Sequence, residues 1–281
     1  MCKKILVTGA NGYLGEGVVK ALLDCGAEVI ATGRSSEFID KRAAIKECDL
    51  FSVRNPFEYF KRPDAVVHLA WQDGFKHDSL AHINELPKHY TFLTKLINNG
   101  IKQVCVLGSM HEVGFHEGSI NENTPCNPLS LYGIAKNALR QSIQIQQKTK
   151  DFVFQWIRGY YIVGNAERGC SIFSKITQSV KEGKKTFPFT QGLNQFDFID
   201  YAEMCNQIAA VAMQTKINEI INCCSGRPEK LADRVERYIK ENGYNILLQY
   251  GAFPDRLYDS KAIWGDDTKI KQILENCETR K

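Results

Sequence analysis

A tyrosine and a lysine four residues apart are the first candidates for chemistry in this sequence. Tyr132 and Lys136 stand in the segment SLYGIAKNAL, and this spacing places both side chains on one face of a helix. A phenol has a pKa of about 10, so it exchanges protons poorly at neutral pH unless a neighbouring charge stabilises its anion. An ammonium group one helical turn away supplies that charge. The pair therefore predicts an acid/base centre, although the same spacing also occurs by chance in ordinary helices.

Three glycines at intervals of three residues predict a phosphate-binding loop near the N-terminus. Gly9, Gly12 and Gly15 stand in TGANGYLG, between the apolar run KILVT and a helical pattern. Glycine weakens a strand or helix by roughly 0.5–1 kcal/mol relative to alanine, so each needs a local reason. In a dinucleotide-binding loop these glycines allow a sharp turn, backbone approach to a pyrophosphate, and packing of the helix on the sheet. The alternative is a tight structural turn without a ligand.

The end of the next strand bears on the choice of dinucleotide. The segment AEVIATGR places Arg34 where this strand ends, and no acidic residue follows before Glu37. A carboxylate here would bind the ribose 2′-hydroxyl of NAD, whereas an arginine suits the 2′-phosphate of NADP. Because a guanidinium binds a phosphate with two parallel hydrogen bonds, the sequence favours NADP(H) over NAD(H). The alternative is an arginine that only faces solvent.

Apolar runs and amphipathic stretches must position these residues. KILVT, EVIAT, AVVHLA, QVCVLGS and FVFQWIRG read as strands buried on both faces. Helical patterns lie between them at residues 12–26, 79–100 and 127–147, and Pro87 kinks the second helix or marks its true start. The alternation predicts an α/β fold, a Rossmann-type doubly wound parallel sheet with helices on both sides.

The pattern loosens after about Val163, which indicates a second region. A helix near residues 171–181, the segment FDFIDYAEM, the strand EIINCCS and the helix PEKLADRVERYIKEN follow in mixed order. We predict a nucleotide-binding domain over residues 1–165, to which residues 195–226 return. Residues 166–194 and 227–281 are predicted to form a smaller, mixed α/β substrate-binding cap.

The overall composition excludes several classes of protein. The chain has 281 residues, a net charge of +4, 43% hydrophobic residues and 24% charged residues. No dense basic run suggests nucleic acid, and no apolar stretch reaches the ~18 residues of a membrane span. The 10 cysteines form no C-x-x-C pair, and no export signal is visible, so reduced thiols in a cytoplasmic protein are expected, with no metal site.

Five short segments, taken in order, resemble the signature of the extended short-chain dehydrogenase/reductases. They are TGANGYLG, CDL at 48–50, HLA at 68–70, GSMHEVG at 108–114 and YGIAK at 132–136. The likeness extends from residue 3 to about residue 226. This family includes nucleotide-sugar epimerases, dehydratases and ketoreductases, so the resemblance implies an enzyme with a nicotinamide cofactor and a nucleotide-sugar substrate.

The resemblance also implies roles for individual residues. Tyr132 would be the acid/base, Lys136 its electrostatic partner, and Ser109 the hydroxyl that binds the reacting oxygen. The implied cofactor-binding residues are Gly9, Asn11, Gly12, Tyr13, Leu14, Gly15, Arg34, Asp49, Leu50, Leu69, Ala70, Tyr132 and Lys136. The implied substrate-binding residues are Ser109, Met110, His111, Tyr132, Tyr161 and Arg168.

Several positions depart from the family pattern. Dehydratases carry an Asp–Glu pair where this chain has His111 and Glu112, and the loss of the Asp counts against dehydration. A histidine there is expected to contact the substrate or to shuttle protons near neutral pH. Tyr161 and Phe196 replace a usual asparagine and arginine. The diphosphate of a nucleotide sugar would then need other cations, such as Arg168 or Lys175.

These observations leave three functions open. The leading one is an NADPH-dependent reductase of a keto group on a nucleotide-linked 6-deoxysugar, in which Tyr132 protonates the oxygen. The alternatives are an NAD-dependent nucleotide-sugar 4-epimerase and a catalytically inactive dinucleotide-binding regulatory protein. Because members of the family commonly pair through two helices, here around 83–98 and 129–146, we also expect a homodimer.

Overall fold

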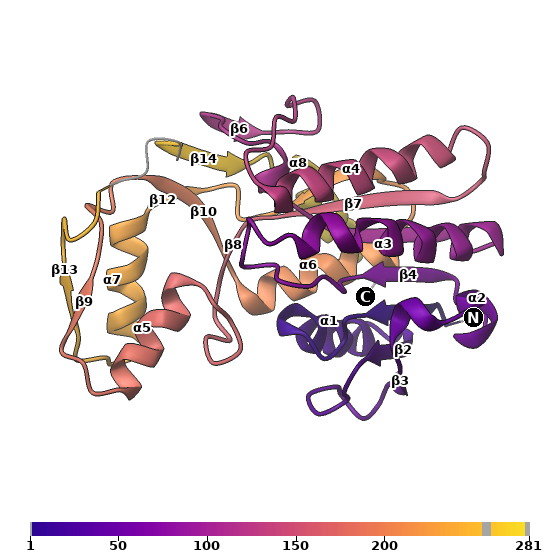
Figure 1. Cartoon of the computed structure of the whole chain (residues 1–281), viewed down its shortest axis with the longest axis horizontal. Coiled ribbons are helices and arrows are strands. Elements are labelled where there is room, and N and C mark those ends of the chain that lie inside the picture. The colour runs from indigo at the N-terminus through magenta and orange to yellow at the C-terminus, as the bar shows by residue number, and fades with distance from the viewer. Residues whose placement is uncertain (1, 255–259, 279–281) are drawn as a thin grey trace.

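The computed structural model describes residues 2–254 and 260–278 and centres on a parallel sheet of seven strands. Taken in spatial order, the strands are β11 (Glu219–Cys223), β7 (Val153–Gly159), β5 (Gln103–Ser109), β4 (Ala65–His68), β1 (Lys4–Thr8), β2 (Glu28–Gly33) and β3 (Ala44–Glu47). Figure 1 shows this sheet in the right-hand body of the molecule. The order runs outward from β1 in both directions, so the sheet is doubly wound with its switch point between β1 and β4.

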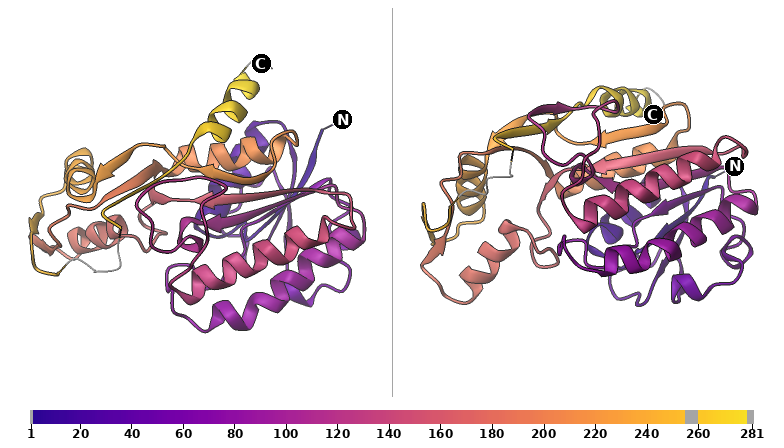
Figure 2. Two further views of the ribbon diagram at one scale, coloured as in Figure 1. Left: turned by 90° about the horizontal axis from the view of Figure 1, so that it is seen from above. Right: turned by 45° about the horizontal axis from the view of Figure 1, so that its top comes forward.

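Helices cover both faces of the sheet. One face carries α1 (Tyr13–Asp24), α6 (Tyr201–Met213) and α8 (Thr268–Glu278), which share a buried apolar cluster with the strands. The other face carries α2 (Pro56–Tyr59), α3 (Ala81–Asn98) and α4 (Leu131–Gln146). In the left view of Figure 2, α3 and α4 lie on the opposite side of the sheet from α6 and α8. Cover on both faces explains why the inner strands read as continuous apolar runs.

A smaller region extends beyond the carboxyl ends of the main strands. Its helices α5 (Ile172–Lys181) and α7 (Leu231–Glu241) and its paired strands β9 (Thr186–Pro188) and β13 (Leu247–Gln249) form what we call the cap, at the left of Figure 1. A second sheet joins the cap to the main body. It contains β12 (Pro228–Lys230), β10 (Gln195–Asp200), β14 (Ala262–Gly265) and β6 (Gly118–Ile120), and β8 (Tyr161–Val163) pairs with β10.

The predicted fold class is confirmed, as are the five strands read from apolar runs. The sequence does not predict β3, because AIKE is short and lies at a largely exposed edge. Pro87 lies inside α3, which begins at Ala81 and continues to Asn98. The local patterns are therefore correct where an element is buried on both faces.

The structure places some segments differently from the predicted division into two regions. Within residues 195–226, α6 and β11 do return to the main body, but β10 belongs to the second sheet. Within residues 227–281, α8 packs on the main body, where Ile270 and Ile273 are buried. Its apolar stripe covers α6 and β11, which would otherwise face water.

Among the residues that the structure describes, no helix is both long and apolar enough to cross a bilayer. The cytoplasmic location remains a prediction.

Candidate active site

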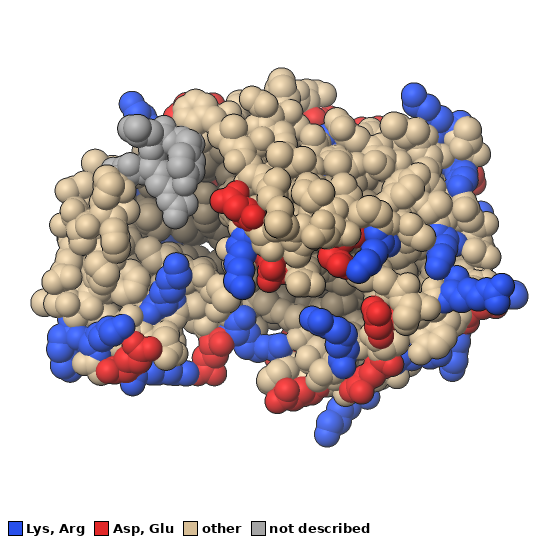
Figure 3. Space-filling model, viewed as in Figure 1, with Lys and Arg blue, Asp and Glu red and all other residues tan. Residues whose placement is uncertain are grey.

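The predicted site residues gather around one large cavity between the main sheet and the cap. The cavity is lined by the loops that follow β1, β2, β4 and β5 and by the beginnings of α4 and α5. Figure 3 shows the surface hollowed where the cap meets the larger body, with Lys, Arg, Asp and Glu side chains around the rim. Open α/β sheets bind their ligands at this carboxyl edge.

The glycine-rich loop after β1 has the geometry of a phosphate site. Gly9 has a φ of +68°, and a Cβ added there would lie 2.7 Å from the backbone nitrogen of Ala70. A Cβ on Gly15 would overlap the carbonyl oxygen of Gly9, so helix α1 packs directly on the loop. Gly12 caps α1 without a side-chain hydrogen bond, which leaves first-turn N–H groups available to an anion. These features fit the pyrophosphate of a dinucleotide.

The other predicted residues of this loop hold it to neighbouring segments. The side-chain oxygen of Asn11 accepts a hydrogen bond from the backbone of Phe38 at 2.8 Å. The hydroxyl of Tyr13 donates to the carbonyl of Gly164 at 2.8 Å. Leu14 packs on the main apolar cluster. The loop is therefore tied on one side to the segment after β2 and on the other to the segment after β8.

The other predicted cofactor-binding residues follow the carboxyl ends of β2, β3 and β4. The exposed Arg34 lines the cavity. The Asp49 side chain accepts from the backbone of Phe51 at 3.1 Å and caps the 3-10 helix η1 (Leu50–Ser52). Leu50, Leu69 and Ala70 also line the cavity. The structure thus brings the predicted cofactor residues to one continuous surface.

Tyr132 and Ser109 meet at the base of the cavity. Ser109 ends β5, and Tyr132 lies in the first turn of α4, whose N-cap Ser130 accepts from the backbone of Gly133. A Cβ on Gly133 would overlap the carbonyl oxygen of His111, so α4 packs tightly on the segment after Ser109. A hydrogen bond from Ser109 lowers the pKa of Tyr132, but burial outweighs it and holds that pKa above its usual value. The phenol is a neutral proton donor at physiological pH.

Lys136 lies one helical turn further along and is held by two other groups. Its Nζ donates to the carbonyl of Leu107 at 2.6 Å and lies 3.8 Å from the ring centre of Trp71. The distance from Nζ to the ring centre of Tyr132 is 5.8 Å. Burial lowers the pKa of Lys136 to about 7. The lysine is therefore near the phenol as predicted, but its closest contacts are the sheet and an indole.

We expect Lys136→Met to stabilise the protein more at pH 6 than at pH 9. The folded-state pKa of about 7 lies below that of the unfolded chain, so the cost of burying the charge is complete below pH 7 and falls as the pH rises towards about 10.4. The bond to Leu107 is lost at both pH values, and the folded-state pKa already includes its effect on the charged amine. Thermal unfolding followed by circular dichroism measures the Tm of both proteins, and an equal Tm difference at both pH values would contradict the account.

Imidazole and indole rings surround Tyr132, and most of them could not be predicted from the sequence. The ring of His77 stacks on Tyr132 at 5.2 Å with an interplanar angle of 9°. The rings of His82 and Trp71 approach Tyr132 at 5.2 and 6.3 Å. The backbone N–H of Tyr132 donates to the carbonyl of His77 at 2.8 Å. Only one feature of the sequence indicates that the irregular segment after β4 belongs to a site: it follows the carboxyl end of a central strand.

His111 and Met110, two of the predicted substrate residues, have different surroundings. The ring of His111 lies 4.3 Å from His77 and 6.3 Å from both Tyr132 and Tyr161, so it faces the reaction centre. Burial lowers the pKa of His111 to about 3, which makes the imidazole neutral and argues against the proton shuttle near neutral pH. Met110 borders the cavity but is largely buried in an apolar cluster, so its main role is packing.

Arg168, predicted to bind the diphosphate of the substrate, lines the cavity. Its guanidinium pairs with Glu16 at 2.7 Å, donates to the carbonyl of Asn11 at 2.6 Å and lies 3.6 Å from the ring centre of Phe38. These contacts place it over the glycine-rich loop, at the cofactor end of the cavity, instead of beside Tyr132. Lys175, the second cation considered for a substrate diphosphate, is exposed and lines the cavity from α5.

A doubly wound sheet with a glycine-rich loop and a Ser–Tyr–Lys group defines a nicotinamide-dependent oxidoreductase. Residues 5–224 match the profile of the NAD dependent epimerase/dehydratase family. The chain belongs to this family and is an NAD(P)-dependent oxidoreductase of the extended short-chain dehydrogenase/reductase type. The resemblance read from the five segments is confirmed.

Individual relatives add detail. The dTDP-6-deoxy-L-talose 4-dehydrogenase (NAD(+)) of Aggregatibacter actinomycetemcomitans is 41% identical over 267 residues, which cover 93% of this chain and 98% of the relative. The UDP-glucose 4-epimerase of Lactobacillus helveticus is 21% identical over 302 residues, 96% of this chain and 91% of the relative. The solved UDP-N-acetylglucosamine 4-epimerase of Methanobrevibacter ruminantium M1 superposes with a TM-score of 0.84 at 20% identity, covering 97% of this chain and 92% of that one. This last likeness shows the fold.

Proposed function

We propose that the protein transfers hydride at C4 of a dTDP-linked 6-deoxyhexose, with NAD(H) as an exchanging coenzyme. The observation that carries the proposal is that Ser109, Tyr132 and Lys136 lie together at the edge of the sheet where we expect the dinucleotide to bind. The chain that contains them is 41% identical to a 4-dehydrogenase along 93% of its length. The reaction interconverts a secondary alcohol plus NAD⁺ with a ketone plus NADH and a proton. Reduction, the direction inferred from the sequence, is the reverse of oxidation at the same site.

The residues of this chain supply binding and proton transfer. Bound NAD(H) would accept or deliver the hydride at the sugar carbon. During reduction the Tyr132 phenol gives its proton to the C4 oxygen and is left as a phenolate; during oxidation this phenolate takes the proton from the C4 hydroxyl. Ser109 hydrogen-bonds the same oxygen. Lys136, held by Leu107 and Trp71, lies beneath the phenol and stabilises negative charge that develops on it. The His77 and His111 rings cover this centre and limit the entry of water.

A panel of sugar nucleotides tests the substrate class. We expect the purified protein to consume NADH, followed at 340 nm, with dTDP-4-keto-6-deoxysugars, and to leave UDP-glucose and UDP-N-acetylglucosamine unchanged. Turnover of the UDP-sugars without net change in NADH would instead support the 4-epimerase alternative. The inactive regulatory alternative receives no support, because the chain belongs to a family of oxidoreductases and keeps the Ser–Tyr–Lys group.

The choice of NADP(H) made from Arg34 is not supported by the relatives. The 41% identical relative is named for NAD(+), and Arg34 is exposed at the rim of the cavity. We therefore propose NAD(H), with kcat/KM at least about tenfold higher for NADH than for NADPH. We expect Arg34→Ala to change the KM for NADH less than about threefold, because an exposed side chain contributes little. A strong preference for NADPH that Arg34→Ala abolishes would restore the original prediction.

We further infer that the protein forms a homodimer through α3 and α4. Both helices expose large apolar side chains that the single chain leaves uncovered, Ile83 and Tyr90 on α3 and Ile134 and Ile145 on α4. Apolar patches of this kind usually mark an interface. Light scattering after gel filtration measures the mass in solution, and a monomeric mass would contradict the inference.

A further inference from the structure

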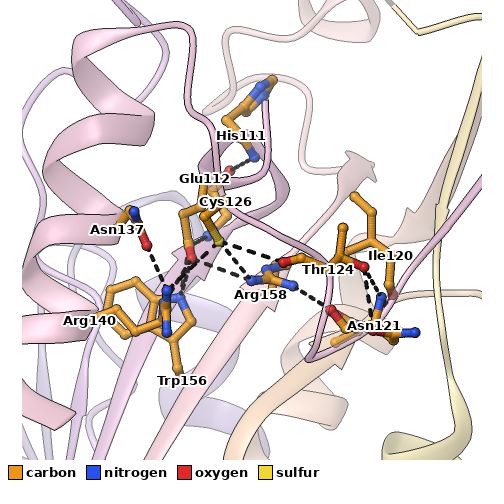
Figure 4. A network of polar contacts seen from close by, with 12 residues as sticks. His111, Glu112, Ile120, Asn121, Thr124, Cys126, Asn137, Arg140, Trp156 and Arg158 are labelled. Carbon is orange, nitrogen blue, oxygen red and sulfur yellow. Dashed lines mark hydrogen bonds and ion pairs between the residues drawn. The ribbon is translucent and has the colours of Figure 1, made fainter. Parts of the chain in front are cut away.

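We propose that Glu112 is a positioning residue: its buried carboxylate holds Ser109 in place and sets the charge near Lys136, without touching the substrate. The inference deepens the proposed hydride transfer and rests on it. Glu112 is fully buried, yet it does not line the cavity. Figure 4 shows its side chain among Trp156, Arg140 and Arg158, which do not line the cavity either.

The first part of the role is a reciprocal cap. Ser109 is the N-cap of the 3-10 helix η2 (Met110–Glu112), and its hydroxyl accepts from the backbone of His111 at 3.3 Å. In return, the backbone N–H of Ser109 donates to Oε1 of Glu112 at 2.6 Å. Since the Ser109 side chain also bonds Tyr132, the carboxylate fixes the residue on which the geometry of the phenol depends.

The second part is a rigid anchor for the carboxylate. The indole Nε1 of Trp156 donates to both oxygens of Glu112, at 2.7 and 2.9 Å. Trp156 lies in β7, whose pairing with β5 places Gly108 opposite Arg158. A Cβ on Gly108 would overlap the indole nitrogen and lie 2.5 Å from Oε1 of Glu112. The glycine before the catalytic serine thus leaves the space that this bond requires.

The third part is charge. Oε2 of Glu112 lies 3.8 Å from Nη2 of Arg158 and 3.7 Å from Nε of Arg140, on β7 and α4 (Figure 4). Burial is the largest influence and holds the pKa of Glu112 above its ordinary value, although the two guanidiniums and the hydrogen bonds from Ser109 and Trp156 lower it. A carboxylate between two buried cations stays ionised, because a neutral acid there would leave both cations uncompensated.

The Glu112 carboxylate is the negative charge that acts on Lys136. The titratable groups that interact with Lys136 come from β4, α3, α4 and η2: His68, His89, Tyr132 and Glu112. Burial lowers the pKa of His68 to about 3 and that of His89 to about 2, so both are neutral. Tyr132 is neutral as well. Glu112 raises the pKa of Lys136 and so keeps more of the amine charged near neutral pH.

Two substitutions separate the bond from the charge. Glu112→Gln keeps an oxygen for Ser109 and Trp156 but removes the negative charge. Glu112→Asp keeps the charge but shortens the side chain by one methylene, which withdraws it from Ser109. Glu117→Gln is the matched control, because the Glu117 carboxylate also accepts two backbone N–H groups, from Lys261 and Ala262 at 2.9 and 3.0 Å, outside the cavity.

The readouts are the pH profile of kcat and the ionisation of Lys136, followed by its ¹³Cε resonance in selectively labelled protein and assigned with Lys136→Arg. For Glu112→Gln we expect the Lys136 titration and the kcat profile to move to lower pH together. For Glu112→Asp we expect kcat to fall about 10–100-fold, with the Lys136 titration close to that of the wild type. The Kd for NADH should change less than about threefold in both, and Glu117→Gln should match the wild type.

Each failure has a distinct signature. A wild-type Lys136 titration in Glu112→Gln together with wild-type kcat in Glu112→Asp overturns the inference. The inference is also overturned if kcat falls only in parallel with Tm and NADH binding, since that pattern indicates a purely structural role. If Glu112→Gln does not fold, Glu112→Asp alone decides through kcat. If the wild type turns over none of the dTDP-sugars, the proposed function fails, and the resonance of Lys136 still tests the inference.

Discussion

Replacing Tyr132 with phenylalanine is expected to lower kcat by about 10²–10⁴-fold, the usual contribution of a positioned acid or base. The change removes only the hydroxyl, which bonds Ser109 and exchanges the proton. The ring still stacks on His77, and the backbone N–H of residue 132 still donates to the carbonyl of His77. Stopped-flow and steady-state absorbance at 340 nm measure kcat, and quenching of protein fluorescence measures the Kd for NADH, which should stay within about threefold.

The matched control is Tyr59→Phe, which also removes one hydroxyl but from an exposed tyrosine of α2 outside the cavity. It should leave kcat unchanged. A Tyr132→Phe protein that retains more than about a tenth of wild-type kcat would show that another group transfers the proton.

Replacing Gly15 with alanine is expected to abolish measurable NADH binding and to destabilise the fold by about 1–3 kcal/mol, the usual cost of overpacking. A Cβ here would overlap the carbonyl oxygen of Gly9 and lie 2.7 Å from Cα of Ala10. Both are backbone atoms of the phosphate loop, so neither can move without changing the loop. Titration of NADH and urea unfolding measure the two effects.

Gly12→Ala provides the comparison. Its added Cβ meets only the carbonyl oxygen of Gly9, at 3.0 Å, so it should weaken NADH binding at least about tenfold while costing less than about 1 kcal/mol of stability. A Gly15→Ala protein that binds NADH like the wild type would contradict the assignment of this loop to the dinucleotide.

The features predictable from sequence are those encoded by short, regular spacing. The glycines of TGANGYLG and the pair Tyr132 and Lys136 are linked through a single turn or helix, so their geometry follows from local rules. The inner strands are equally predictable from the sequence, because burial on both faces requires unbroken apolar runs. The edge strand β3 lacks such a run and is missed.

The features that sequence could not predict depend on contacts between distant segments. Arg168 reaches Glu16 and Asn11 across the cavity, and no spacing relates a loop after β8 to the start of α1. His77 covers Tyr132 from an irregular segment without periodicity. In the sequence, Glu112 is only part of a departure from a family motif. Its proposed role depends on contacts with Trp156 and Arg158, which lie on a strand more than forty residues later.

The choice of cofactor shows a different limit. Arg34 stands where an arginine can bind a 2′-phosphate, but an exposed side chain at a rim has many alternatives. One residue type at one position therefore carries little information without the ligand. Residues that are forced together by packing, such as Gly9 and Ala70, carry far more.

The most direct test of the central claim follows the hydride itself. Wild-type protein is incubated with [4-²H]NADH, both C4 diastereomers in separate reactions, and a dTDP-4-keto-6-deoxyhexose, and the product is analysed by NMR and mass spectrometry. We predict that one of the two diastereomers places one deuterium at C4 of the sugar for each NADH oxidised. NADH oxidation that places no deuterium at C4 of the sugar with either diastereomer, or no oxidation of NADH at all, would contradict the account.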